Sequence, residues 1–392
     1  MLVGQSNTEY VLIEAVVYVF GYLGLLCLTY FSVALAIGGV PWVSHPFSIA
    51  IETIGAIEIL FYLFWYLPYV NYLRKQRPRF SSPLHREQRR DFLQKSLAAC
   101  SDVELFVKGW MCGASLEDVR RENLKDWFLW ALFDREGPPL DDDEELEEYV
   151  RLVEEALGRN IGPGWGPADS VRLNFQHLDV SHRSLVYYCI IGFVDFTASI
   201  VLLLSGFSFY RQPRSMFLRT FPFRPLTLFS PKVSASPHLS YFCRPHKSKT
   251  HRPIVFIHGL GIGVSIYIPF FLMLPKDVGI LGIEFLPVTS HITDGMPVAD
   301  DLVRDIRDVI SQQMTSDFVF VGNSYGTFIT KLFIESPYLA ARMSKIVLID
   351  PVAVLLQLPD LAYNFTKRKP SSGRELAWSW SGWKGSTMDR DF

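Results

Sequence analysis

The sequence predicts an α/β protein with a mostly parallel sheet, helices on both faces of that sheet, and apolar helices ahead of it. Short β-branched and aromatic runs alternate with helical patterns between Ile254 and Pro351, which is typical of βαβ units. Residues 15–43 carry no charge, a run longer than the roughly 20 apolar residues that cross a bilayer. We expect four parts: a transmembrane hairpin at 1–80, a helical region and connector at 81–232 with a third apolar helix at 185–209, the sheet core at 233–370, and an atypical tail at 371–392.

The composition excludes some function classes. The chain of 392 residues has 38 basic and 40 acidic side chains, and this balance argues against nucleic acid as a partner. The mean hydropathy of +0.17 and the aromatic content of 14% favour contact with a membrane. Five scattered cysteines without a C-x-x-C pair predict free thiols in a reducing compartment. We expect neither a metal site nor a cofactor, and the oligomeric state stays open.

The N-terminal apolar residues predict a membrane anchor. After 15–43, a second apolar stretch covers 47–73 but contains Glu52 and Glu58, which makes it the weaker span. No Lys or Arg precedes residue 74, and the basic cluster Arg74–Arg79 follows at once. The positive-inside rule keeps this cluster cytosolic, so we expect a hairpin with both ends and the sheet core in the cytosol. The alternative is a buried helical pair in a soluble protein.

The region between anchor and core is predicted to be helical. Residues 83–134 show amphipathic patterns, and the acids of 141–148 predict a solvated helix start more readily than a cation site. The third apolar stretch, interrupted only by Asp195, is long enough to cross. Arg183 before it and basic residues up to Arg224 after it fit a helix in the membrane interface better. A helix buried beneath the sheet core is equally compatible.

The first motif of the core follows the predicted strand 253–257. It is His258-Gly259-Leu260-Gly261-Ile262-Gly263, with glycines spaced differently from the G-x-G-x-x-G of dinucleotide sites. An upstream strand at 239–243 would be joined to it by a hairpin loop at 244–252. Downstream we expect a strand at 279–286 and a helix at 298–314, whose apolar face is Leu302, Ile306, Val309 and Ile310.

The second motif is Gly322-Asn323-Ser324-Tyr325-Gly326, which fits G-x-S-x-G, the nucleophile elbow of α/β-hydrolases. It lies between a strand at 317–321 and a helix at 327–336, as an elbow requires. We therefore predict Ser324 as a nucleophile. The backbone N–H groups of Leu260 and Tyr325 would form the oxyanion hole. The motif glycines Gly259, Gly261, Gly322 and Gly326 would leave room for the two tight turns.

The rest of a catalytic triad is less evident. Asp350 ends a predicted strand at 345–349 and is a candidate acid, although Asp350-Pro351 is as readily a simple turn. The base in this fold is a histidine after the acid, but the last histidine is His291, upstream of Ser324. We assign His258 to loop geometry rather than catalysis. The residues after 370 do not predict further strands, so we expect a core that lacks its C-terminal strands.

Several short runs together resemble a group of fungal membrane-anchored α/β-hydrolases, over about 83–370. They are Arg121–Lys125, His182–Leu185, Phe256–Gly259, Asn323–Gly326, Leu348–Pro351 and Leu358–Phe365. The resemblance implies a serine hydrolase with Ser324 on the elbow and Leu260 and Tyr325 as oxyanion donors. It also implies a histidine base in a C-terminal part that this chain does not match.

Two hypotheses follow. In the first, the protein is a membrane-anchored serine hydrolase of the esterase, lipase or thioesterase type, acting on an ester or thioester of an apolar acyl group. In the second, it is a truncated or inactive hydrolase scaffold that serves as a binding protein.

Overall fold

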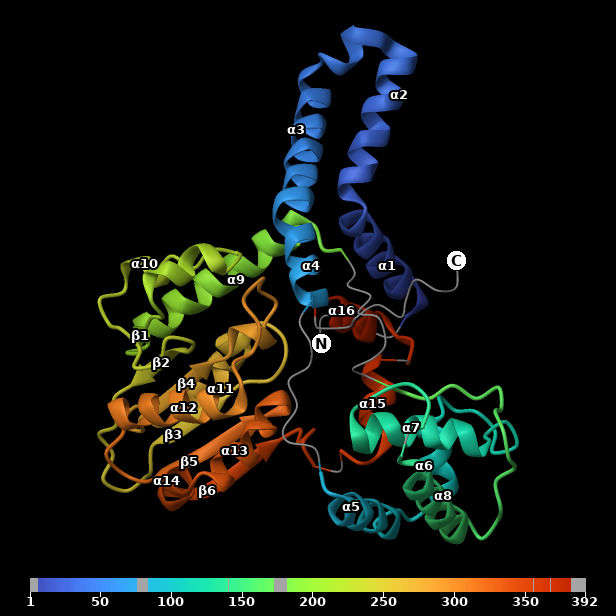
Figure 1. The fold of residues 1–392 in the computed structure, drawn as a ribbon. Helices are drawn as coiled ribbons and strands as arrows, with labels where there is room; N and C mark the ends of the chain where they lie inside the picture. The colour runs from blue at the N-terminus through green and yellow to red at the C-terminus, as the bar shows by residue number, and fades with distance from the viewer. Residues whose placement is uncertain are drawn as a thin grey trace. The chain divides into compact units, whose positions relative to one another are not determined.

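The computed structural model describes residues 6–75, 84–139, 141–172, 182–354, 356–366 and 368–381 (Figure 1). These residues form two compact units. The sheet unit takes its described residues from Met1–Gln76, Val180–Val354 and Pro370–Trp383, and the helical unit takes them from Arg77–Asp179 and Leu355–Lys369. Residues 76–79 of the predicted basic cluster lie outside the described residues.

The sheet has six strands in the described chain, in the order β1-β2-β4-β3-β5-β6. They are β1 (Ser208–Tyr210), β2 (Ser240–Arg244), β3 (Ile254–Ile257), β4 (Ile280–Glu284), β5 (Phe318–Asn323) and β6 (Met343–Ile349). The pairs from β4 to β6 are parallel, and β1 and β2 are added antiparallel. The predicted mostly parallel α/β sheet is therefore confirmed.

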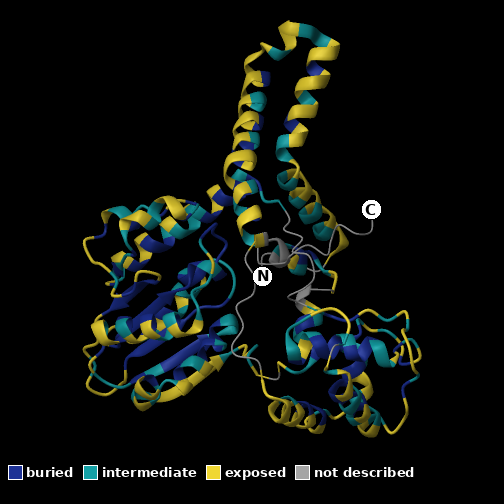
Figure 2. Cartoon of the chain, viewed as in Figure 1, coloured by how far each residue is buried: buried dark blue, intermediate teal, exposed yellow. Residues whose placement is uncertain are grey.

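Helices cover both faces of this sheet because its strands alternate apolar side chains between two cores. On one face Phe242, Phe256, Ile280 and Val321 pack with Leu202 of α9 (Leu185–Leu204) and Phe271 of α11 (Ile268–Met273). On the other face Val255, Ile257, Leu281 and Phe320 pack with α12 (Ala299–Gln313) and α13 (Ile329–Glu335). The four residues predicted for the apolar face of α12 are all buried. Figure 2 shows the buried strands between the exposed outer faces of these helices.

The connections include several short elements. They are η2 (Arg214–Arg219), α10 (Leu226–Phe229), η3 (Gly263–Tyr267), η4 (Leu286–Val288), η5 (Ser324–Thr327) and α14 (Pro337–Arg342). The predicted hairpin at 244–252 is wrong, because β2 pairs with β1 and β4 and not with β3. β4 inserts between β2 and β3, and only the spatial order of strands could show that.

The outer strand β6 is unusual for a parallel sheet. Its residues 344–348 are exposed, although Ile346, Val347 and Leu348 are apolar and alternate between the two faces. One backbone edge of β6 pairs with β5, and in the described residues no strand pairs with the other.

Three helices of the described chain are long and apolar enough to cross a membrane. They are Leu23–Val43, Pro46–Leu73 and Leu185–Leu204. The first is α2, which follows α1 (Asn7–Gly21), and the second comprises α3 (Pro46–Phe61), a π-helical turn (Tyr62–Tyr66) and the start of α4 (Leu67–Lys75).

The helices α2 and α3 pack antiparallel at close range. A Cβ on Gly55 would lie 2.5 Å from the Cβ of Cys27, so the glycine lets the backbones approach. The hydroxyls of Tyr30 and Ser48 are 2.7 Å apart nearer the tip. The large apolar side chains on the outside of both helices are exposed (Figure 2). After the sheet, α16 (Gly373–Ser381) packs against α1, with Gly373 close to Tyr10.

The helical unit consists of α5 (Arg86–Ala98), α6 (Val103–Trp110), α7 (Arg121–Phe133), α8 (Asp143–Leu157) and α15 (Pro359–Thr366). The sequence placed α15 in the sheet core, but its Ala362 is buried in the core of the helical unit. The acids at 141–148 were predicted to be a solvated face, and this is wrong for Glu145. Glu145 is buried and accepts two hydrogen bonds of 2.9 Å from Arg89, and the buried Lys125 Nζ contacts Asp143 and Glu147. These ion pairs join α5 and α7 to α8.

Candidate active site

Ser324 lies directly after β5, where the chain turns into η5. Its φ of 48° is in the left-handed region, which a residue with a Cβ rarely adopts. β5 ends immediately before Ser324 and η5 begins at it, so the chain changes direction at this residue. The two flanking elements together hold Ser324 in the strained conformation. Backbone strain of this kind is concentrated at functional sites.

The glycines around Ser324 are required by close approach of backbones. A Cβ on Gly326 would lie 2.5 Å from the carbonyl oxygen of Ile257, the last residue of β3. A Cβ on Gly322 would lie 3.0 Å from the carbonyl oxygen of Gly326. A Cβ on Gly259 would lie 2.8 Å from the Cβ of Ser324. The two sequence motifs are therefore in contact, at the neighbouring carboxyl ends of β3 and β5.

Tyr267, in η3, ties the two motifs together and was not predicted from the sequence. Its hydroxyl donates to Asn323 Oδ1 at 2.6 Å and accepts from the Gly259 N–H at 3.2 Å. Burial raises the pKa of Tyr267, so the hydroxyl keeps its proton at neutral pH. No sequence pattern marks this residue, since an aromatic residue in the helix after a glycine loop is most simply a packing residue.

Leu260 and Tyr325 are the predicted oxyanion donors. Leu260 follows the glycine that contacts Ser324, and Tyr325 follows Ser324 in the first turn of η5. In the described part of the chain, neither backbone N–H has a hydrogen-bond acceptor. The first N–H groups of a helical turn are free in this way, and such groups can hold a negatively charged oxygen.

Asp350 lies beside the elbow. Because Asn323 pairs with Ile349 in the parallel β5–β6 ladder, Asp350 takes the position next to Ser324. The loop after Asp350 is attached to the elbow by Thr327, whose Oγ1 donates to the Ser324 carbonyl and accepts from the Ala353 N–H. Asp350 has a φ of 46° and is exposed to solvent.

His258 has a structural role. Its Nε2 accepts from the Phe285 N–H at 3.0 Å, so the proton is on Nδ1, which donates to the Gly259 carbonyl at 2.7 Å. Burial lowers the pKa of His258 to about 4. With both ring nitrogens occupied, the imidazole fixes the start of the glycine loop against the end of β4.

His291 lies near the same loop. The Ser290 N–H donates to the Gly261 carbonyl at 2.8 Å, and the imidazole Nδ1 is 2.8 Å from Thr289 Oγ1. Its Nε2 is buried without a partner in the described residues, and burial lowers the pKa of His291 to about 4. Its electrostatic neighbours are Asp195, Arg224 and His258, none of which belongs to the elbow. None of the described histidines is hydrogen-bonded to Ser324.

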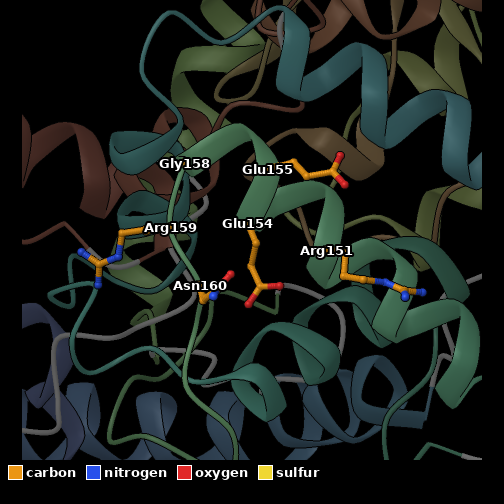
Figure 3. Close-up of a pocket in the computed structure, with 6 residues that line it drawn as sticks. All are labelled: Arg151, Glu154, Glu155, Gly158, Arg159 and Asn160. Carbon is orange, nitrogen blue, oxygen red and sulfur yellow. The ribbon is translucent and has the colours of Figure 1, made fainter.

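A solvent-open hollow of about 510 Å³ lies in the helical unit and not at the elbow (Figure 3). It is lined by Arg151, Glu154, Glu155, Gly158, Arg159 and Asn160, at the end of α8. Glu154 is already engaged by Arg121 and by the Ile161 N–H. In the described residues, no group of three or more His, Cys, Asp and Glu side chains could hold a metal ion.

The comparisons with known proteins add no family assignment. No protein-family model matches the sequence, and no curated protein matches it significantly.

Proposed function

We propose that the protein is a membrane-anchored serine hydrolase that cleaves an ester or thioester of an apolar acyl group. The observation that supports this most is the backbone of Ser324. A left-handed serine between a parallel strand and a helical turn, in contact with a glycine loop, is the arrangement that presents a serine hydroxyl to a substrate.

In this proposal each residue has one role. The Ser324 hydroxyl oxygen attacks the acyl carbonyl and gives its proton to a base. The carbonyl oxygen becomes negative and is held by the N–H groups of Leu260 and Tyr325. The leaving alcohol or thiol takes a proton, and water then releases the acid from Ser324 by the reverse steps. Asp350 is the proposed acid, and the resemblance noted above assigns the base to a histidine outside the matched positions.

The proposed setting is a cellular membrane. The hairpin of α2 and α3 would be embedded in the bilayer, with the six-stranded sheet and its flanking helices on the cytosolic side, and the apolar acyl substrate would come from the same lipid phase. The exposed apolar side chains on both hairpin helices support this placement, since water is a poor solvent for such a surface.

A fluorophosphonate probe tests the catalytic part of the proposal, because it reacts with activated serines. We expect the full-length protein in detergent to be labelled and Ser324→Ala to be unlabelled. Ser311→Ala, on the exposed side of α12, is the matched control and should label like the wild type.

Two results would contradict the proposal. Equal labelling of wild type and Ser324→Ala would show that Ser324 is not the nucleophile. No labelling of a folded wild-type protein would favour the second candidate, a hydrolase scaffold that binds without catalysis. The finding behind that candidate is that both nitrogens of His258 are committed to backbone hydrogen bonds.

A further inference from the structure

The helix α9 has two faces of different character. Tyr187, Tyr188, Ile191, Ala198, Ser199 and Leu202 are buried against the rest of the sheet unit. The opposite face carries mainly apolar side chains, among them Phe193, which is 68% exposed, and Leu204, which is 84% exposed. The Thr197 hydroxyl on this face donates to the Phe193 carbonyl at 2.9 Å. An exposed apolar face of this size is unfavourable in water, so we expect it to be covered by lipid or by another protein surface.

The middle of α9 is fixed to the sheet by a buried ion pair. Asp195 Oδ2 accepts from Arg224 Nε at 2.8 Å, and the same guanidinium makes two hydrogen bonds of 2.9 and 3.0 Å to Glu284 on β4. Ser240 on β2 completes the set with a 2.8 Å bond to Glu284. Arg224 was predicted as part of a membrane-flanking basic stretch, but it is buried. Because Asp195 lies near the centre of α9, the helix could cross a bilayer only if the sheet were also in the hydrocarbon.

The start of α9 is fixed to the hairpin. The Leu185 N–H donates to both oxygens of Glu58 at 2.9 and 3.0 Å, and His182 Nε2 is 3.3 Å from Glu58 Oε1. From Pro46, at the tip of the hairpin, to Glu58 the helix α3 is about 20 Å long at 1.5 Å per residue. The hydrocarbon layer is about 30 Å thick. The part of the hairpin beyond Glu58 is therefore too short to cross the hydrocarbon layer. It can reach the far surface of the bilayer only if the start of α9, which is bonded to Glu58, is itself immersed in the near leaflet.

Aromatic residues gather beside the first turn of α9. The ring centroid of Trp65 lies 5.6 Å from that of Phe221 and 5.7 Å from that of Phe223. The ring of Phe221 also contacts the ring of Tyr188 in α9. Trp65 and Phe223 are partly exposed. Tryptophan and tyrosine are enriched where membrane proteins pass the headgroup region. In Figure 1, α9 leaves this point at a large angle to α3 rather than alongside it.

We infer that α9 lies in the plane of the bilayer surface, with its outer face, from Ile190 to Leu204, immersed in the acyl chains of one leaflet. The occupant of that face is lipid. The inference rests on the membrane association proposed above but not on catalysis by Ser324. The six-stranded sheet and its helices would then rest on the membrane surface, in addition to being anchored by the hairpin.

Depth-dependent fluorescence quenching tests this inference on the full chain in phosphatidylcholine vesicles. Single cysteines at Ile190, Phe193, Phe196 and Leu204, in a background without the native cysteines, would carry the fluorophore NBD. Vesicles would contain lipids with a nitroxide at acyl carbon 5 or carbon 12. We expect all four positions to be quenched severalfold more by the shallow nitroxide than by the deep one, with similar ratios along the helix.

Two further positions serve as controls. Leu28→Cys, exposed on α2, should be quenched more by the deep nitroxide, and Ser311→Cys on α12 should be quenched by neither. If Leu28 is not quenched, the membrane anchor itself is wrong, independently of α9. Deepest quenching at Phe196 with shallow ends would overturn the inference in favour of a crossing helix. Blue-shifted emission on α9 without quenching by either lipid would overturn it in favour of a protein cover.

Discussion

The glycine loop and the elbow meet where Gly259 faces Ser324: a Cβ at position 259 would lie 2.8 Å from the Cβ of the serine. Carbon atoms that are not bonded to each other do not approach so closely in folded proteins. The space for the serine side chain is therefore created by an absent side chain on the neighbouring strand end.

Gly259→Ala should abolish fluorophosphonate labelling while leaving the protein folded. The added methyl group has to displace either Ser324 or the loop that carries the Leu260 N–H, and a shift of about 1 Å at a catalytic group costs on the order of 100-fold in rate. Labelling rate and circular dichroism would be measured together. Gly21→Ala is the control, since a Cβ there meets nothing within 4 Å. Unchanged labelling of Gly259→Ala would mean that the loop is not part of the site.

Ser324→Gly should make the protein more stable and unreactive. Glycine adopts a φ of 48° without the steric cost that serine bears, and removing such strain contributes about 1 kcal/mol. The midpoint of urea unfolding in detergent would be compared with that of Ser324→Ala, which keeps the Cβ and hence the strain. If the glycine variant is no more stable than the alanine variant, Ser324 is not strained in the native state.

Arg224→Met should destabilise the sheet unit strongly. The substitution leaves Asp195 and Glu284 buried without their counter-ion, and breaking a buried pair in this way costs about 3–5 kcal/mol. Arg252→Met is the matched control, because its pair with Asp317 is 3.8 Å long and half exposed, so we expect a loss of less than about 1 kcal/mol. Similar losses in the two variants would show that the Arg224 cluster is not buried in solution.

Stability should fall as the pH is lowered from 7 to 4. His258 and His291 have folded-state pKa values of about 4, below the ordinary value of 6.5, so between these values the unfolded chain binds more protons than the folded one. By linkage, each histidine then removes roughly 1 kcal/mol of stability per pH unit. His291→Asn should flatten the pH dependence, and His251→Asn, at an exposed position, should leave it unchanged. An equal slope in all three proteins would contradict the burial of His291.

The sheet and its helices could be predicted because they depend on local patterns. The runs at 253–257 and 317–321 are short, β-branched and bounded by glycine or turn residues, and both are strands within a residue or two. The pairing of β2 with β4 could not be predicted, because it depends on which strands meet in space. The edge strand β1 was missed because Ser208–Tyr210 continues the apolar composition of α9.

The backbone turn of the candidate site could be predicted from the sequence. The hydrogen bonds between its side chains could not. Gly322, Ser324 and Gly326 form a pattern that predicts a tight turn when it lies between a strand and a helix, and both the pattern and its flanks can be read from the sequence. Tyr267 is 56 residues from Asn323 in the chain and is joined to it by a single hydrogen bond. Arg224 was misassigned for a related reason. An arginine after an apolar helix usually marks a membrane flank, and only the fold places Asp195 and Glu284 around it.

The open side of β6 has a practical consequence for handling the protein. Along the edge that pairs with no other described strand, its amides, together with the exposed Ile346, Val347 and Leu348, can template an incoming strand from another molecule. Lys345 is the one charged residue within β6, and its charge opposes pairing with a second copy of this strand. Concentrated preparations should therefore tend toward β-rich aggregates seeded at this edge, and a second lysine at Val347 would be a direct way to keep the protein monodisperse.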